Sequence, residues 1–283
     1  VRACPLPETD QDTRDGRYAS FAFSHKMPKI NTNNPQVADY FARLCARWVA
    51  DYKVDSIRFD VGNEVSHCFL KQVRRQVRAI RGDVYLLGEI WHDASPWLEG
   101  DEYDAVMNYP LKQTISHFFA HQAWSAQRLE WTLTRCLGMY RRQTTQVMFQ
   151  LLDSHDTDRL ITRTADENVF FQQLAMLFTL PGSPCIYYGT EVALPGGHDP
   201  DCRRCMPWDE LENPEVQVRI EQVKELIRLR RENRDLREGT LVFHSGLGNT
   251  RWVWYDRNKI QVLLNCGDQA WPLEVAGEIL FAR

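Results

Sequence analysis

The first periodic stretch of the chain follows a polar region over residues 1–33. Asn34 and Pro35 are typical of a helix cap followed by a proline in the first turn, and apolar residues then recur at spacings of three and four up to position 52. A short apolar run over 54–60 ends in an acid, and a second helical pattern covers 65–80. The pattern therefore predicts a helix, a strand and a second helix, in that order.

This alternation continues through the middle of the chain. Four further apolar runs, over 84–89, 104–108, 146–152 and 184–188, are separated by helix-like segments. With the run at 54–60 they make five strands, and strands that alternate with helices are typically parallel and joined by crossover helices. Either a doubly wound sheet or a barrel fits this α/β pattern. The first strand is not followed by a glycine-rich phosphate loop, which disfavours a dinucleotide-binding fold.

The pattern changes at Gly239, after a last amphipathic helix around 216–227. Beyond it, short runs punctuated by glycine and asparagine predict a small antiparallel sheet, which we interpret as a second domain. The predicted strands cover 241–244, 251–255, 261–264 and 271–275.

Composition and charge narrow the classes of partner. A chain of 283 residues with 43% hydrophobic content can bury a sizeable core. The net charge is −4 and acidic and basic residues are interspersed, which disfavours nucleic acid and anionic membranes as partners. No apolar run reaches the roughly 18 residues that a membrane-spanning helix needs, so we expect a soluble chain with no membrane segment.

The eight cysteines are too sparse for a scaffold held together by disulfides. Cys202 and Cys205 form a Cys-x-x-Cys pair just after His198, but a single pair is a weak zinc signal. Four other cysteines lie inside apolar patterns, where we expect buried free thiols. These four are Cys45, Cys68, Cys136 and Cys185.

Three acids follow predicted strands, at the place where a parallel barrel carries its chemistry. Asp60 ends the first of the five strands, Glu89 ends the second, and Asp156 follows the fourth. A single acid in such a position is more often a helix cap or a turn former. Three of them in one chain are a stronger indication of a functional site.

Asp60 and Glu89 have surroundings that suit a retaining glycosidase. Arg58 precedes Asp60 by two residues, so both side chains share one face of the strand and the guanidinium favours a charged nucleophile. Glu89 is flanked by apolar residues, which would desolvate its carboxyl group and favour the protonated form that a general acid needs. Retaining glycosidases hold two such groups about 5 to 5.5 Å apart. The alternative is an ion pair of Arg58 and Asp60 with no catalytic role.

At these residues the chain resembles the glycoside hydrolases of the α-amylase superfamily, in particular the cyclomaltodextrinase, neopullulanase and maltogenic amylase group. Asn63 and Glu64 match this group at the end of the family's nucleophile segment. The segments that carry the resemblance are 27–31 (Met-Pro-Lys-Ile-Asn, the group's marker), 55–64 (Asp-Ser-Ile-Arg-Phe-Asp-Val-Gly-Asn-Glu, the nucleophile), 88–93 (Gly-Glu-Ile-Trp-His-Asp, the general acid) and 154–157 (Ser-His-Asp-Thr, the stabilising aspartate).

The resemblance implies a (β/α)8 TIM barrel, of which this chain holds mainly strands 4 to 8, followed by a small C-terminal antiparallel β domain. It implies a remnant of the family's loop domain over 1–33, the C-terminal part of the catalytic barrel over 34–235, and the β domain over 236–283. The family's first catalytic segment and first three strands have no match here. Because an open section of a barrel exposes a strand edge at each side, we expect the segment alone to be inactive and poorly folded.

The resemblance also implies a reaction, namely double displacement at α-1,4-glucosidic bonds of cyclodextrins, maltodextrins or pullulan. Asp60 would attack the anomeric carbon and Glu89 would protonate the leaving oxygen, before water releases the sugar. Asp156 would stabilise the transition state. The other residues expected to bind substrate or orient the acids are Arg58, His155, Asn63, Glu64, Trp91 and His92, although a tryptophan such as Trp91 is equally often packed in a core.

Other interpretations of the same acids remain open. An α-1,6-glucosidase or a glucanotransferase differs in its sugar pocket, and the marker at 27–31 argues against both. A non-catalytic barrel relative would usually have lost an acid. Thr190 and His198 depart from the family pattern, which affects the outer sugar subsites.

Partners and location follow from the resemblance alone. It implies an α-glucan oligosaccharide as the partner, no resident cofactor, a bacterial cytoplasmic location and a homodimer of the full-length protein. Calcium is undecided, because the chain has no oxygen-ligand loop of the helix-loop-helix kind.

Overall fold

The protein forms two compact units, and each is described by itself. The computed structural model describes residues 14, 16, 18–164, 166–244, 250–268 and 277–282. The first unit comprises Val1–Ile90 and Ala94–Val106, and the second comprises Trp91–Asp93 and Met107–Arg283.

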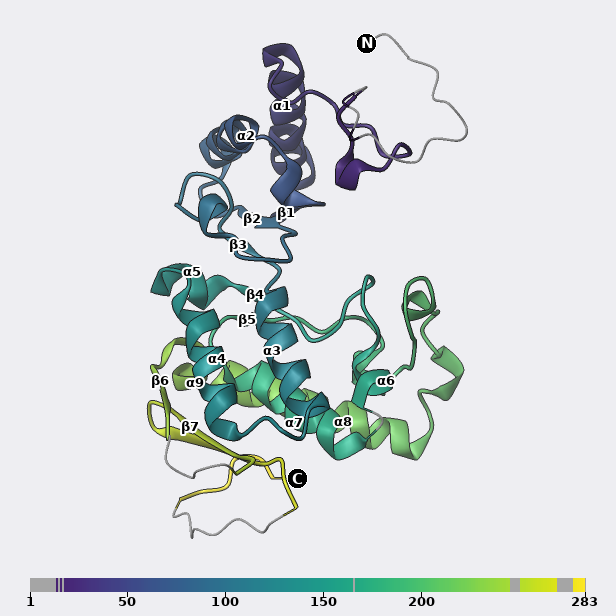
Figure 1. Cartoon of the computed structure of the whole chain (residues 1–283), viewed down its shortest axis with the longest axis vertical. Helices are drawn as coiled ribbons and strands as arrows, with labels where there is room; N and C mark the ends of the chain where they lie inside the picture. The colour runs from purple at the N-terminus through teal and green to yellow at the C-terminus, as the bar shows by residue number, and fades with distance from the viewer. Residues whose placement is uncertain are drawn as a thin grey trace. The chain divides into compact units, whose positions relative to one another are not determined.

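The first unit contains a three-stranded parallel sheet in the order β1-β2-β3 (Figure 1). Strand β1 (Ser56–Phe59) pairs with β2 (Tyr85–Gly88), and β2 pairs with β3 (Ala105–Val106). The parallel pairing confirms the prediction from the alternating pattern. Since parallel strands end at the same edge, Asp60 and Glu89 leave this sheet side by side.

Two helices of the first unit pack against each other beside this sheet (Figure 1). Helix α1 (Pro35–Tyr52) begins where the sequence predicts, because the Asn34 side chain accepts hydrogen bonds from the first backbone N–H groups. Helix α2 (His67–Ile80) turns its apolar face inward and buries Val73 and Val77 completely. Both predicted helices are therefore confirmed.

The second unit has a two-stranded parallel sheet, a group of helices and a three-stranded antiparallel sheet (Figure 1). Helix α7 is its centre, since most of its side chains are buried against neighbouring helices and the antiparallel sheet. Its parallel strands are β4 (Phe149–Gln150) and β5 (Ser183–Pro184), and its antiparallel strands are β6 (Leu241–Phe243), β7 (Trp252–Arg257) and β8 (Ile260–Asn265). Its helices are α3 (Tyr109–Ala120), α4 (Ala126–Gly138), α5 (Arg142–Val147), α6 (Leu160–Thr164), α7 (Glu167–Thr179), α8 (Pro214–Glu232) and α9 (Arg234–Glu238).

Two buried arginines cap the C-terminal end of α7. Arg230 donates to the carbonyl groups of Phe178 and Leu180, and Arg257 donates to the carbonyl group of Thr179. Burial lowers the pKa of each arginine to about 10. The cationic groups lie where the negative end of the helix dipole is strongest, which helps to hold them in the core.

Several sequence predictions need correction. The run at 146–152 is strand only at Phe149–Gln150, because its first residues end helix α5, and short apolar runs fit a buried helix turn as well as a strand. The strand predicted at 184–188 is observed at Ser183–Pro184, and the chain then turns at Gly189, where φ is +81°. No α-helix joins β2 to β3, only a short 3-10 turn at Ser95–Trp97.

The antiparallel pairing at the C-terminal end agrees with the prediction for 241–244, 251–255 and 261–264. The strand predicted at 271–275 lies outside the described residues. None of the helices in the described part of the chain is long and apolar enough to cross a membrane.

The cysteines are only partly as predicted. Those in the described residues are free, and Cys45 and Cys136 are buried as expected. Cys68 is exposed, because it lies in the first turn of α2 and outside the buried stripe of that helix. Cys185 is half-buried.

Candidate active site

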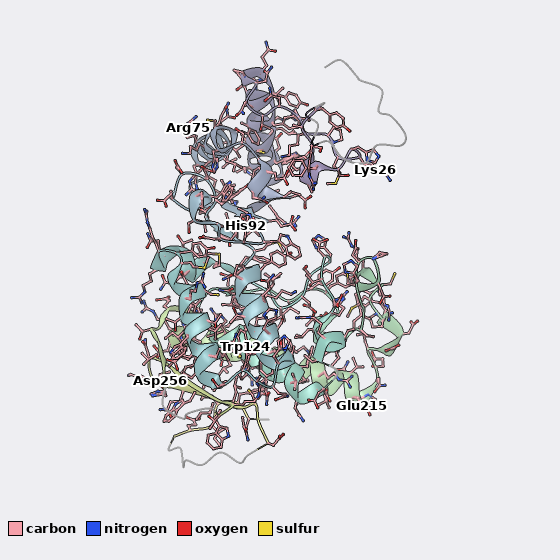
Figure 2. All side chains as sticks on the ribbon, viewed as in Figure 1. Lys26, Arg75, His92, Trp124, Glu215 and Asp256 are labelled. Carbon is pink, nitrogen blue, oxygen red and sulfur yellow. The ribbon has the colours of Figure 1, made fainter. Side chains whose placement is uncertain are left out.

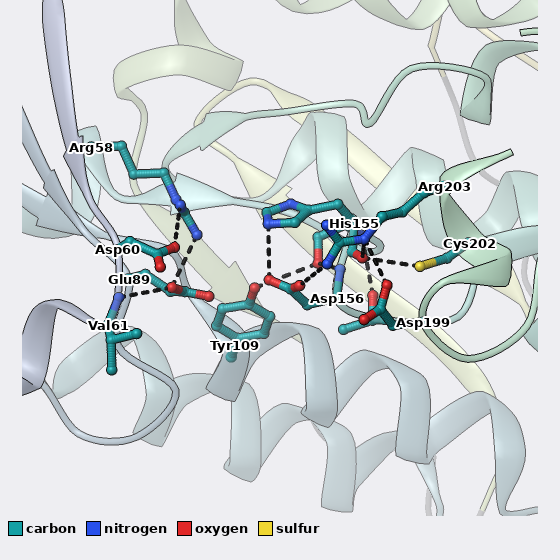
Figure 3. Close-up of polar contacts among 12 residues, drawn as sticks. Arg58, Asp60, Val61, Glu89, Tyr109, His155, Asp156, Asp199, Cys202 and Arg203 are labelled. Carbon is teal, nitrogen blue, oxygen red and sulfur yellow. Dashed lines mark hydrogen bonds and ion pairs between the residues drawn. The ribbon is translucent and has the colours of Figure 1, made fainter. Parts of the chain in front are cut away.

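One arginine binds two of the predicted catalytic acids at the end of the sheet of the first unit (Figure 3). Nη1 of Arg58 lies 2.8 Å from Oδ1 of Asp60, and Nη2 lies 3.0 Å from Oε2 of Glu89. Neighbouring nitrogens of one planar guanidinium hold these oxygens, so the two carboxyl groups lie close together.

The two acids differ strongly in exposure. The Asp60 side chain is 71% exposed, whereas the Glu89 side chain is 8% exposed. The burial of Glu89 agrees with the sequence prediction, but its surroundings are more polar than the flanking residues suggested. Its Oε2 also accepts a hydrogen bond of 3.0 Å from the backbone N–H of Val61.

The backbone around Glu89 is fixed by close contacts. Val61 has a φ of +44°, a rare value for a β-branched residue, and such strain is concentrated at functional sites. The Glu89 N–H donates to the Phe59 carbonyl, and the Glu89 carbonyl accepts from the Gly62 N–H. A side chain at Gly88 would lie 2.6 Å from the Tyr103 ring, so only glycine fits there. These contacts fix the backbone from which the Glu89 side chain projects.

Glu64 is committed to contacts within the first unit. Its Oε2 lies 2.5 Å from Nζ of Lys29, and both carboxylate oxygens accept from the backbone N–H of Ala22 at 3.1 and 3.3 Å. Glu64 ends the 3-10 turn Gly62–Glu64, and the half-buried Asn63 lies in the middle of it. Both residues predicted to touch sugar therefore lie within four positions of Asp60.

The third predicted acid forms a separate cluster in the second unit (Figure 3). Oδ2 of Asp156 lies 3.0 Å from Nε2 of His155, and Oδ1 lies 2.9 Å from Nη2 of Arg203. Nε of Arg203 also lies 2.6 Å from Oδ1 of Asp199 and donates to the His155 carbonyl. Arg203 and Asp199 were not predicted from the sequence, because Arg203 ends the short 3-10 turn Asp201–Arg203 and Asp199 lies just before it, where no strand or long helix pattern marks them.

A buried carboxyl group lies three residues before Asp156 in the sequence. Asp153 is 4% exposed, and it accepts hydrogen bonds from the Leu160 N–H and from the Thr190 hydroxyl. Burial raises the pKa of Asp153. Thr190 is itself buried beside Asp153, and the effect of this departure from the family pattern on the outer sugar subsites stays a prediction.

Trp91 forms a partly exposed aromatic surface. Its ring stacks on Tyr109 with 3.7 Å between the centroids and 7° between the planes, and Trp91 is 41% exposed while Tyr109 is fully buried. One face of Trp91 is thus packed against Tyr109, as expected for a core tryptophan, while the 41% exposure of the residue leaves surface for a sugar ring. His92, labelled in Figure 2, is exposed, and its Nδ1 lies 2.9 Å from the Asp93 carbonyl oxygen.

The two cysteines of the Cys-x-x-Cys pair, Cys202 and Cys205, have different surroundings. Cys202 is fully buried and its thiol donates to the His155 carbonyl at 3.0 Å, while Cys205 is exposed. In the part of the chain that the structure describes, no three His, Cys, Asp or Glu side chains are grouped as a metal site requires.

The fold and the site define an α/β domain with acidic side chains at the ends of parallel strands. The chain belongs to the α-amylase family, since the family model "Alpha amylase, catalytic domain" matches residues 9–222.

Several named glycoside hydrolases are similar in sequence to this chain. The chain is 44% identical over 271 residues to a cyclomaltodextrinase of Bacillus sp, and the matched region covers 94% of this chain and 48% of the relative. It is 46% identical over 230 residues to an intracellular maltogenic amylase of Bacillus subtilis, covering 80% of this chain and 39% of the relative. A solved cyclomaltodextrinase structure superimposes with a TM-score of 0.82 at 43% identity, covering 88% of this chain and 43% of that one. The chain thus spans about half the length of the relatives it matches.

Proposed function

We propose that this protein is a retaining glycoside hydrolase that cleaves α-1,4-glucosidic bonds of cyclodextrins, maltodextrins or pullulan. The observation that carries the proposal is the single guanidinium of Arg58 that binds both Asp60 and Glu89. Two carboxyl groups at neighbouring strand ends, one exposed and one buried, suit a nucleophile and a general acid. Membership of the α-amylase family and the names of its relatives support the same chemistry.

The proposed reaction has two steps. Asp60 attacks the anomeric carbon while the Glu89 proton passes to the glycosidic oxygen, so that the leaving sugar departs and a glycosyl ester forms on Asp60. Glu89, now ionised, takes a proton from water, and the resulting hydroxide attacks the anomeric carbon and restores the Asp60 carboxylate. Arg58 orients both carboxyl groups throughout.

The remaining residues are proposed to bind sugar. Asp156 and His155, held by Arg203, suit hydrogen bonds to ring hydroxyl groups. The ring of Trp91, supported from behind by Tyr109, suits stacking on a glucose ring. Asn63 and His92 are the other candidates for sugar contacts.

We further propose that the parallel strands β1 to β5 correspond to strands 4 to 8 of a (β/α)8 barrel, over residues 34–235. Residues 1–33 would then belong to the family's loop domain and 236–283 to a C-terminal β domain. The parallel pairing within each unit and the family match support this assignment.

Location and assembly are also proposals. A bacterial cytoplasmic location is supported by the relative named as an intracellular maltogenic amylase. The proposed partners are an α-glucan oligosaccharide and a second copy of the full-length protein.

The test of the function is the substitution Glu89→Gln in the protein as it occurs, with its full flanking sequence. We expect turnover of β-cyclodextrin and maltotriose to fall by about 10²- to 10⁴-fold, because the amide can neither give nor take the proton. Binding of maltotriose, measured by calorimetry, should remain. Glu221→Gln, an exposed acid of α8 paired with Lys224, is the matched control and should turn over normally. Normal turnover in Glu89→Gln would exclude Glu89 as the acid.

A further inference from the structure

Two segments that are far apart in the sequence meet at one carboxylate in the first unit. Lys29 belongs to the marker segment 27–31, and Glu64 belongs to the nucleophile segment 55–64. Their charged atoms lie 2.5 Å apart, and each side chain is only 24% exposed. A pair that is largely shielded from water is screened less by salt than a fully exposed pair.

Glu64 binds two parts of a small folded segment, near Ala22 and at Lys29. Residues 18–29, which contain the labelled Lys26 (Figure 2), are closed by their own hydrogen bonds, from the Phe21 N–H to the Met27 carbonyl and from the Lys29 N–H to the Ala19 carbonyl. Glu64 binds one part through the Ala22 N–H and the other through the Lys29 ammonium. The segment is therefore tied as a unit to the turn that follows Asp60.

The ion pair of Lys29 and Glu64 has two features that a solvent-exposed ion pair lacks. The Lys29 ammonium also lies 5.0 Å from the centre of the Phe21 ring, so an aromatic face supports it in addition to the carboxylate. Ala22 and Phe23 have φ values of +50° and +58°, which are uncommon for residues other than glycine. Glu64 accepts from the N–H of one of these two residues, so it helps to hold the segment in a strained conformation.

The same turn connects the segment to the acids. Glu64 ends the turn Gly62–Glu64, and Val61, just before it, donates its N–H to Glu89. Side chains of the segment 18–29 remain open to solvent, including Phe23 at 55% and Met27 at 44% exposure.

We infer that the Lys29–Glu64 pair is a positioning element that sets how the enzyme accepts large α-glucans. Glu64 acts through the segment 18–29, which it holds beside Asp60 as a wall for sugars beyond the cleavage point. This role differs from the direct sugar contact expected from the sequence, because the carboxylate already has a cation and a backbone donor. The inference rests on the proposed function, since it assigns a role to the same site.

The test is a double-mutant cycle in the full-length protein with Lys29→Met, Glu64→Gln and the double variant. Hydrogen exchange of the backbone amides of 18–29 reports whether the pair holds the segment. Kinetics with β-cyclodextrin and with the small substrate p-nitrophenyl α-maltoside report whether this matters for large glucans. Arg43→Met is the matched control, because it breaks an exposed ion pair with Asp39 on α1.

Each single variant should exchange about five- to tenfold faster over 18–29, in line with loss of a charge-assisted contact. KM for β-cyclodextrin should rise about fivefold while kcat and the kinetics of the small substrate change by less than about twofold. The double variant should match the singles, because both remove the same pair, and Lys29→Arg should restore wild-type behaviour.

Unchanged exchange in Lys29→Met, additive effects in the double variant, or faster exchange without a change in KM for β-cyclodextrin would each overturn the inference. A wild-type protein that turns over neither substrate would instead refute the proposed function, and that result is separate from the variants.

Discussion

The substitution Arg58→Met tests the arrangement at the strand ends through stability alone. Arg58 has an exposed partner, Asp60, and a buried partner, Glu89, whose side chain is 8% exposed. Loss of the exposed pair should cost about 0.2 to 1 kcal/mol. Loss of the buried pair should cost about 3 to 5 kcal/mol, because the largely buried carboxyl group of Glu89 would lose its cationic partner. We therefore expect a loss of roughly 3 to 5 kcal/mol in the free energy of unfolding, nearly all of it from Glu89.

A second variant separates the two contributions. In Arg58→Met with Glu89→Gln, the buried side chain is neutral and can still accept from Val61, so about 2 kcal/mol of the loss should return. Chemical denaturation at pH 7 measures all of these free energies, with Arg43→Met as a control that should change stability by less than about 0.5 kcal/mol. A double variant no more stable than Arg58→Met would show that the contact between Arg58 and Glu89 does not account for the loss.

Three further predictions concern burial elsewhere in the chain. Cys68 is exposed, whereas Cys45 is buried and burial raises its pKa to about 11, so in the native protein Cys68 should react with a thiol reagent at least about 100-fold faster than Cys45. Equal reaction rates of the two thiols, measured by mass spectrometry, would contradict this prediction. Burial raises the pKa of Asp153 in the folded state, so Asp153→Asn should be more stable than wild type above the ordinary pKa of aspartate and lose this advantage at lower pH, by about 1.4 kcal/mol for each unit of pKa shift. A difference in the free energy of unfolding between the two proteins that stays constant from pH 4 to pH 8 would refute this prediction. Burial lowers the pKa of Lys112 to about 8, so Lys112→Met should raise the free energy of unfolding by about 1 to 3 kcal/mol at pH 7. Chemical denaturation should show this gain decreasing as the pH rises from 8 toward 10.5.

Local signals in the sequence identified the elements that depend on neighbouring residues. The cap at Asn34 and the proline after it specify the start of α1, and the apolar run before Asp60 specifies β1. The acids Asp60 and Glu89 could be recognised because each follows such a run. The parallel pairing then brings their backbones to the same edge, as the alternation of strands and helices predicts.

Contacts between distant residues could not be read from the same patterns. Arg203 meets Asp156 across 47 positions, and Lys29 meets Glu64 across 35, so no periodicity relates either pair. The polar partners of Glu89 were also hidden, because its neighbours in sequence are apolar while its donors come from Arg58 and Val61 on the adjacent strand end.

We expect Asp60 to form a covalent bond to the substrate during the reaction. Full-length protein treated with 5-fluoro-α-glucosyl fluoride and digested with protease would reveal the labelled residue by mass spectrometry, since a slow second step lets the glycosyl ester accumulate. We expect a peptide containing residues 59–71 that carries one fluoroglucosyl group on Asp60. A label on any other carboxyl group, or turnover that releases only the inverted sugar with no labelled peptide, would contradict it.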